Sequence, residues 1–137
     1  MAEAREITVS GSVIIEEVSS LPYTRAVSKI EAAIRSAKLM VVGEPNYQMM
    51  QRMVGRERKG GKAYFIFRPD LGTPIFENDA NGAMEVPLKI LIMEQADGKT
   101  VIRYKKPSTI LDDYEGLSGL ANQLDEIMAK IAEAGIK

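Results

Sequence analysis

The stretch of residues 87–105 constrains the fold more than any other part of the chain. Residues 87–94 and 100–105 are two strand candidates, the first apolar and the second rich in β-branched and aromatic side chains. Asp97 and Gly98 lie between them, and this pair tolerates the positive φ angles of a tight hairpin turn. The strands are therefore predicted to pair antiparallel, which excludes a sheet built only from parallel strands.

Two segments have the apolar spacing of amphipathic helices. In residues 22–37, apolar side chains recur every three or four positions, and Pro22 and Thr24 suit a helix start. Residues 117–131 repeat this spacing, and Gly135 is the expected stop. A helix is predicted in each place.

The remaining segments are shorter. Residues 7–17 alternate between apolar and polar side chains around Gly11, which predicts one half-buried strand. Residues 39–42 and 63–68 are predicted strands, and residues 47–54 a short helix. Residues 70–86 contain so many turn-forming residues that a loop is predicted there.

These elements follow the order β-α-β-(short α)-β-β-β-α, which is typical of an α+β fold. The chain has 137 residues, 45% of them hydrophobic and 27% charged, and this suits a single globular domain over residues 1–137. The two long helices are expected to cover one face of the sheet.

The second face of the sheet needs a separate explanation. Leu88, Ile90 and Ile92 lie on one side of the central strand, while Leu91 and Met93 lie on the other. An exposed apolar patch on a small domain usually marks an interface, so we expect a homodimer. The alternative is that the short middle helix and residues 70–86 cover this face within one chain.

The absence of certain residues limits the chemistry. The chain has no Cys and no His, which excludes disulfides, thiolate chemistry, a Ser-His-Asp relay and Cys/His zinc sites. A general base would have to be a carboxylate, Lys or Tyr with a shifted pKa. The candidate carboxylates suit turns and helix caps better than catalysis. They are Asp70, Asp79, Asp112 and Asp113.

Several local motifs resemble a known family. FRPDLGTPIF, at residues 67–76, contains Gly72 and Pro74, and VPLKILIMEQADGKTVIRYKKP follows at residues 86–107. Over about residues 19–134 the chain resembles the uncharacterised family called domain of unknown function 302. The resemblance implies a β-α-β4-α antiparallel sheet similar to the halves of TATA-binding protein, a homodimer, and a prokaryotic setting. It implies no established activity.

A basic loop is the first candidate site. Arg52, Arg56, Arg58, Lys59 and Lys62 lie close together in sequence among glycines, and such a loop can wrap a phosphate or carboxylate. It lacks the spacing of a phosphate-binding P-loop. The alternatives are an anion-binding protein or enzyme that uses this loop, and an ordinary solvated surface.

Two methionines form a second candidate. Met49 and Met53 lie four residues apart, so their thioethers could converge on a helix and bind Cu(I) or face a haem-type ligand. Methionine is more commonly an adaptable filler of apolar space, so packing in the core or in a dimer is the preferred interpretation.

The third candidate is a ligand site near residues 70–86, with Arg68, Asp70, Gly72 and Pro74 at its start. Nucleic acid is not expected, because only Lys89, Arg103 and Lys105 are plausible outward cations on the strands and the net charge is -1.

The leading hypothesis is a non-enzymatic, homodimeric binding domain for a small ligand or a partner protein, with no cofactor and no metal. No targeting segment and no long apolar run are visible, so we expect a cytoplasmic protein without a membrane partner.

Overall fold

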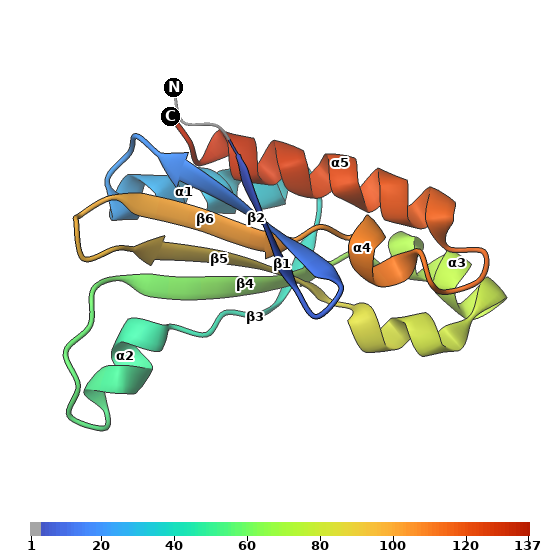
Figure 1. Ribbon diagram of the computed structural model, residues 1–137, viewed down its shortest axis with the longest axis horizontal. Coiled ribbons are helices and arrows are strands. Elements are labelled where there is room, and N and C mark those ends of the chain that lie inside the picture. The colour runs from blue at the N-terminus through green and yellow to red at the C-terminus, as the bar shows by residue number, and fades with distance from the viewer. Residues whose placement is uncertain (1–3) are drawn as a thin grey trace.

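The fold is built on one antiparallel sheet with the strand order β1-β2-β6-β5-β4-β3. We describe residues 4–137 in a computed structural model; the first three residues of the predicted domain lie outside this range. Figure 1 shows the strands lying side by side. They are β1 (Arg5–Val9), β2 (Ser12–Ser19), β3 (Met40–Gly43), β4 (Gly61–Phe67), β5 (Leu88–Glu94) and β6 (Thr100–Lys105).

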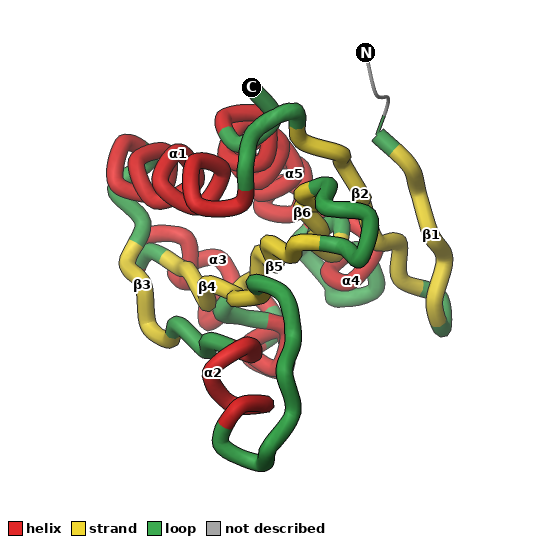
Figure 2. The backbone as a smooth tube through the Cα atoms, turned by 90° about the vertical axis from the view of Figure 1, so that its left-hand side faces the viewer, coloured by secondary structure: helices red, strands yellow, loops and turns green. Residues whose placement is uncertain are grey.

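Two long helices cover one face of this sheet. Figure 2 shows α1 and α5 on the same side, whereas α2 lies on the other side. The helices are α1 (Tyr23–Ser36), α2 (Tyr47–Arg52), α3 (Pro69–Asn78), the 3-10 helix η1 (Ala80–Glu85), α4 (Ser108–Leu111) and α5 (Ser118–Ala134). This arrangement confirms the predicted α+β class and the two helices on one face.

The core lies between this helix pair and the sheet. Ile90, Ile92 and Ile102 are fully buried on the helix side of the sheet, and they face the apolar sides of α1 and α5. Burying a large aliphatic side chain stabilises the fold by about 1.5–3 kcal/mol. The two helices supply the other half of this core, through the apolar residues that recur at helical spacing. These are Ile30 and Ile34 from α1, and Leu124, Met128 and Ile131 from α5.

The prediction of one strand at residues 7–17 was wrong. The chain forms the hairpin β1–β2 there, and Val9 pairs with Ser12 across the turn. Ser10 and Gly11 both have positive φ, at 49° and 84°, as a two-residue hairpin turn requires. The period-two alternation continues on both sides of this turn, so the pattern alone did not separate the strands.

The prediction of a loop at residues 70–86 was also wrong. Most of that segment is helical, in α3 and η1. Pro69 occupies the first turn of α3, where its missing N–H costs nothing, and Leu71 and Ile75 bury one side of the helix. The turn-forming residues Pro74 and Gly72 are accommodated inside α3 rather than ending it.

A clasp formed by the C-terminal residues ties α5 back to the start of α1. Ser20 N–H donates to the carbonyl of Ile136 at 2.8 Å, and the buried Ser19 hydroxyl donates to the carbonyl of Gly135. Both bonds join residues more than a hundred positions apart, at the end of β2 and just after α5.

The opposite face of the sheet, which we call the open face, is not covered by the long helices. Leu91 and Met93 point to this face and are half-buried within the single chain. The most exposed apolar side chains lie elsewhere, on β3, on and after α2, and at Val9, Phe76 and Met84. Among residues 4–137, no helix is long and apolar enough to cross a membrane.

Candidate functional site

A cavity of about 360 Å³ lies on the open face, between the centre of the sheet and the segment that leads into β5. Four elements and η1 contribute to its wall, because the strands run side by side here and η1 and α4 close one end. The lining residues are Ile14, Met84, Glu85, Pro87, Leu88, Lys89, Leu91, Arg103, Tyr104, Lys105 and Ile110.

Three cationic side chains line this cavity. Lys89 on β5 and Lys105 on β6 point to the same face, and the register places them opposite each other one step beyond the pair Ile90–Tyr104. Like charges at such positions repel each other. Within residues 4–137, neither ammonium group lies within ion-pair distance of a carboxylate. An anion in the cavity would balance their charge.

The third cation, Arg103, is held in place by a buried carboxylate. Its Nε donates to Glu16 Oε2 at 2.7 Å, and Arg5 approaches the other oxygen of Glu16 at 2.9 Å. The Glu16 side chain is only 8% exposed. Its charge is thus shared by two guanidinium groups from β1 and β6, and Arg103 enters the cavity wall in a fixed orientation.

One carboxylate also lines the cavity, but it has a partner. The Tyr114 hydroxyl donates to Glu85 Oε2 at 2.7 Å, and this hydrogen bond raises the pKa of the Tyr114 phenol. Tyr104 forms part of the wall, and burial raises its pKa to about 12, so it is neutral near pH 7. The cavity wall therefore combines three cations with one carboxylate, and that carboxylate already accepts a hydrogen bond from Tyr114.

The rest of the wall is apolar. Ile14, Leu91 and Ile110 are half-buried there, and they surround the space beside the cations. The Lys89 ammonium lies over the rings of Phe65 and Tyr47, at 5.4 Å and 5.7 Å from their centroids. These cation–π contacts bias the direction of an otherwise flexible side chain. This arrangement suits a molecule with an apolar body and an acidic group.

Comparison with known proteins places this architecture in a family. Residues 15–135 match the domain of unknown function DUF302. The chain belongs to the DUF302 family. A crystal structure of an uncharacterized conserved DUF302 protein from Bacillus stearothermophilus is similar in fold, with a TM-score of 0.79 and 12% sequence identity. The similarity covers 88% of this chain and 96% of that one. No curated protein matches the sequence.

The basic loop of this DUF302 domain does not line the cavity on the open face. Arg52, Arg56, Arg58 and Lys59 are exposed on and after α2. Lys62 is separate from them, because its ammonium lies 2.6 Å from Glu44 Oε1 and its side chain is only 15% exposed. Four of the five predicted anion-binding residues therefore stay exposed on this arm and loop, and an anion-binding role for them stays a prediction.

The residues of the predicted ligand loop have structural partners in the DUF302 domain. Arg68 donates from Nε to Asp70 at 2.6 Å, and from a terminal nitrogen to the Ala37 carbonyl at 2.7 Å. Gly72 is buried beside the Phe67 ring, and Pro74 lies within α3. None of these four residues lines the open-face cavity, although Met84 and Glu85, at the end of the same segment, do. A ligand role for the four stays a prediction.

Of the two preferred interpretations for Met49 and Met53, packing in the core was wrong, and packing in a dimer stays a prediction. Met49 and Met53 are 57% and 79% exposed, so they do not fill the core of the single chain. Binding of Cu(I) or haem by these residues stays a prediction. Within residues 4–137, no three His, Cys, Asp or Glu side chains are grouped so that they could hold a metal ion.

The candidate carboxylates do not converge. Asp70 pairs with Arg68, and Asp79 caps η1 by accepting from the Asn81 N–H at 3.0 Å. Asp112 and Asp113 are exposed after α4. The cap role that the sequence indicates matches the contact of Asp79, whereas Asp70 lies in the first turn of α3 and pairs with Arg68 without capping the helix.

Sequence reasoning singled out Lys89, Arg103 and Lys105 as outward cations but assigned them no ligand. It missed Glu85 and its partner Tyr114, which are 29 residues apart and meet only in the tertiary fold. The period-two pattern of β5 and β6 does put the three cations on one face, so that pattern is the signal that could have found the site.

Proposed function

We propose that this protein is a binding domain for a small organic anion with an apolar body, held in the cavity on the open face. The observation that carries the proposal is the pair Lys89 and Lys105, which share a wall with Leu91 and have no carboxylate partner within residues 4–137. A bound carboxylate, sulfonate or phosphate would balance the charge of these two cations, and its apolar part would contact Leu91, Ile14 and Ile110.

The test uses the fluorescent aromatic sulfonate ANS as a probe, because it combines an apolar body with one negative charge. We expect saturable binding with one molecule per chain. The double substitution Lys89→Ala and Lys105→Ala should weaken this binding at least tenfold, which corresponds to about 1.4 kcal/mol. Lys130→Ala, on the exposed side of α5, is the matched control and should leave binding unchanged.

Two results would contradict the proposal. One is ANS binding of equal strength in the double variant and the wild type. The other is equal binding of a neutral analogue without the sulfonate, because this would show that the cations contribute nothing.

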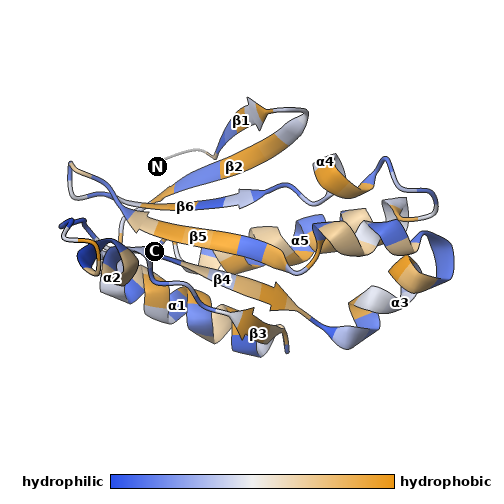
Figure 3. Ribbon diagram, turned by 90° about the horizontal axis from the view of Figure 1, so that it is seen from below, coloured by the Kyte–Doolittle hydropathy of each residue, from blue (hydrophilic) through white to orange (hydrophobic). Residues whose placement is uncertain are grey.

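We also propose that the domain is a homodimer, formed through β3 rather than through the central strand. Figure 3 shows β3 as an apolar strand at the edge of the sheet. Met40, Val41 and Val42 are 54%, 45% and 57% exposed, and β3 contains no charged residue. Natural edge strands usually carry charges or prolines that prevent pairing with another chain. Two copies of β3 paired antiparallel about a twofold axis would satisfy the free edge of both.

A further inference from the structure

The most unusual surface outside the cavity is the arm formed by α2 and the turn after it. α2 buries none of its residues. Met49, Met50, Met53 and Val54 are each more than half exposed, and Met53 and Val54, at 79% and 71%, are among the most exposed apolar side chains of the domain. Such exposure is costly in water unless another surface covers these side chains.

The arm is amphipathic, but its orientation is the reverse of that in an ordinary surface helix. At helical spacing, Met49 and Met53 share one side with Met50 and Val54, whereas Gln48, Gln51 and Arg52 share the other. On the polar side, the loop that follows holds Gln48, whereas the Arg52 side chain stays 60% exposed. Gln48 Nε2 donates to the Arg58 carbonyl, and Arg56 N–H donates to the Gln51 carbonyl, each at 2.9 Å. The apolar side is left facing solvent.

The turn at the tip of the arm is held in one conformation. Met53 N–H donates to the Met49 carbonyl at 3.1 Å, and Gly55 N–H donates to the Arg52 carbonyl at 3.0 Å. Gly55 has a φ of 79°, a conformation that favours glycine and ends the helix here. Met53 and Val54 are therefore presented by a hydrogen-bonded turn.

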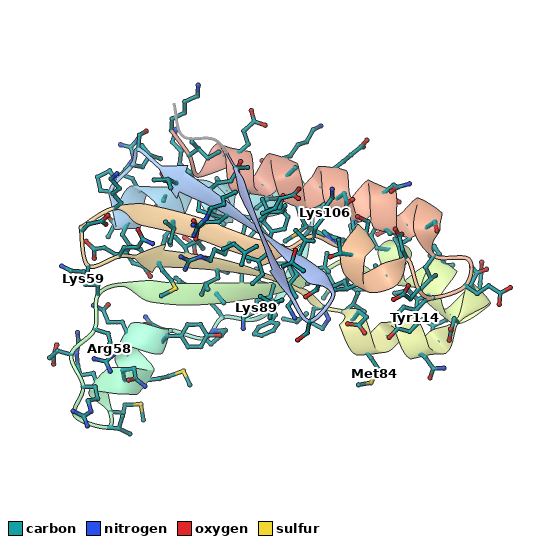
Figure 4. All side chains as sticks on the ribbon, viewed as in Figure 1. Arg58, Lys59, Met84, Lys89, Lys106 and Tyr114 are labelled. Carbon is teal, nitrogen blue, oxygen red and sulfur yellow. The ribbon has the colours of Figure 1, made fainter. Side chains whose placement is uncertain are left out.

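Positive charge flanks the apolar tip in the sequence. Arg52 precedes Met53 directly, and Arg56 and Arg58 follow Val54. Glu57 is the one carboxylate between residues 47 and 60, and its oxygen lies 3.9 Å from Arg52 Nε at an exposed position. Figure 4 shows Arg58 beside α2, and Lys59 farther along the loop toward the start of β4. The tip therefore carries an excess of guanidinium groups.

The shape of the arm decides which partner it fits. Figure 1 shows α2 and its loop projecting away from the sheet, so the tip is convex. A peptide or a small ligand is usually held in a groove or a concave pocket. The tip is convex, with apolar side chains at its end and cations beside them. It instead fits a flat partner that has an anionic surface layer and an apolar interior. A bilayer with anionic lipids has this chemistry.

We infer that the arm docks this domain on the surface of anionic membranes. Met53 and Val54 enter the boundary between headgroups and acyl chains, while Arg52, Arg56 and Arg58 contact lipid phosphates. Guanidinium groups suit this role because their donors match phosphate oxygens in pairs. The inference differs from the expectation of no membrane partner, which considered only spanning segments and net charge.

The experiment is co-sedimentation of the full chain with phosphatidylcholine vesicles that contain either no phosphatidylserine or about a third of it. We expect binding to the anionic vesicles only, weakened by added salt. The double substitution Met53→Gln and Val54→Asn should reduce binding at least tenfold, and so should Arg52→Glu with Arg56→Glu. Phe76→Gln is the matched control, because Phe76 is 71% exposed on α3, and Figure 1 shows α3 at the opposite end of the molecule from α2.

The outcomes separate this inference from its alternatives. Absence of binding to anionic vesicles overturns it. Binding that survives the Met53 and Val54 substitutions also overturns it, since charge alone then explains the effect. Equal binding to soluble polyglutamate points to an acidic protein partner instead and overturns it too. Lys105→Ala, which removes a cavity cation on β6, should bind vesicles like the wild type, so failure of the cavity proposal would leave this one intact. Thermal unfolding of each variant checks that the fold is retained.

Discussion

Glu17 lies on the helix side of β2, in a place that disfavours its charge. Partial burial raises the pKa of the Glu17 carboxyl, and the nearby Glu133 carboxylate raises it further. A carboxyl whose pKa is higher in the folded chain than in the unfolded one lowers stability above that pKa. The penalty disappears when acid protonates the group in both states.

Replacing Glu17 by Gln should therefore stabilise the domain near neutral pH and not in acid. We expect a gain of up to ~1 kcal/mol in the free energy of unfolding at about pH 7, limited because solvent screens the carboxylate. The gain should vanish at about pH 4. Urea unfolding at both pH values measures it, with Glu77→Gln on the exposed side of α3 as the control. A gain that is equal at both pH values would show that charge is not its cause.

Some residues of the candidate site can be predicted from the sequence, and others cannot. Alternation along β5 and β6 is enough to place Lys89, Arg103 and Lys105 on one face. The contact between Tyr114 and Glu85 depends on how η1 and the segment after α4 pack together, and no local pattern records that. The burial of Glu16 between two arginines likewise requires knowledge of the order of the strands.

At the scale of elements, Arg68 connects two helices. It contacts the Ala37 carbonyl at the end of α1 and Asp70 in the first turn of α3. Arg68→Ala should lower the free energy of unfolding by about 1–2 kcal/mol, because a charge-assisted hydrogen bond at a partly buried position is lost. Arg35→Ala, at an exposed position in the last turn of α1, should change it by less than about 0.5 kcal/mol. Denaturant titration compares the two.

That prediction also tests the role of the predicted ligand loop. If Arg68→Ala left stability unchanged, the contacts with α1 would not be its main role, and a ligand role would gain support.

The sequence predicts helices and strands well where the apolar residues keep a single spacing without interruption. Helices α1 and α5 appear within a residue or two of their predicted bounds, because their apolar spacing runs unbroken. The β1–β2 hairpin was missed, because alternation has the same form on both sides of Gly11. Helix α3 was missed because Gly72 and Pro74 resemble loop residues, while the packing of Leu71 and Ile75 overrides that local preference.

For the whole molecule, the main prediction concerns association through β3. Sedimentation over a range of micromolar concentrations should show twice the mass of one chain. Val42→Lys should yield single chains, because a charge on the edge strand disfavours pairing with a second copy. Met84→Lys adds the same charge at an exposed position outside β3 and should leave the mass unchanged. A single-chain mass for the wild type, or an unchanged mass for Val42→Lys, would contradict the β3 dimer.

The clasp between Ser19, Ser20 and the residues after α5 bears on how the protein is made. During synthesis the sheet emerges from the ribosome before the helix that covers half of its apolar side, and the clasp needs the carbonyl of Ile136. A nascent chain that has not yet reached Ile136 therefore leaves much of its apolar surface in contact with water or with a chaperone. The native packing of this domain can be completed only after residue 136 has left the ribosome.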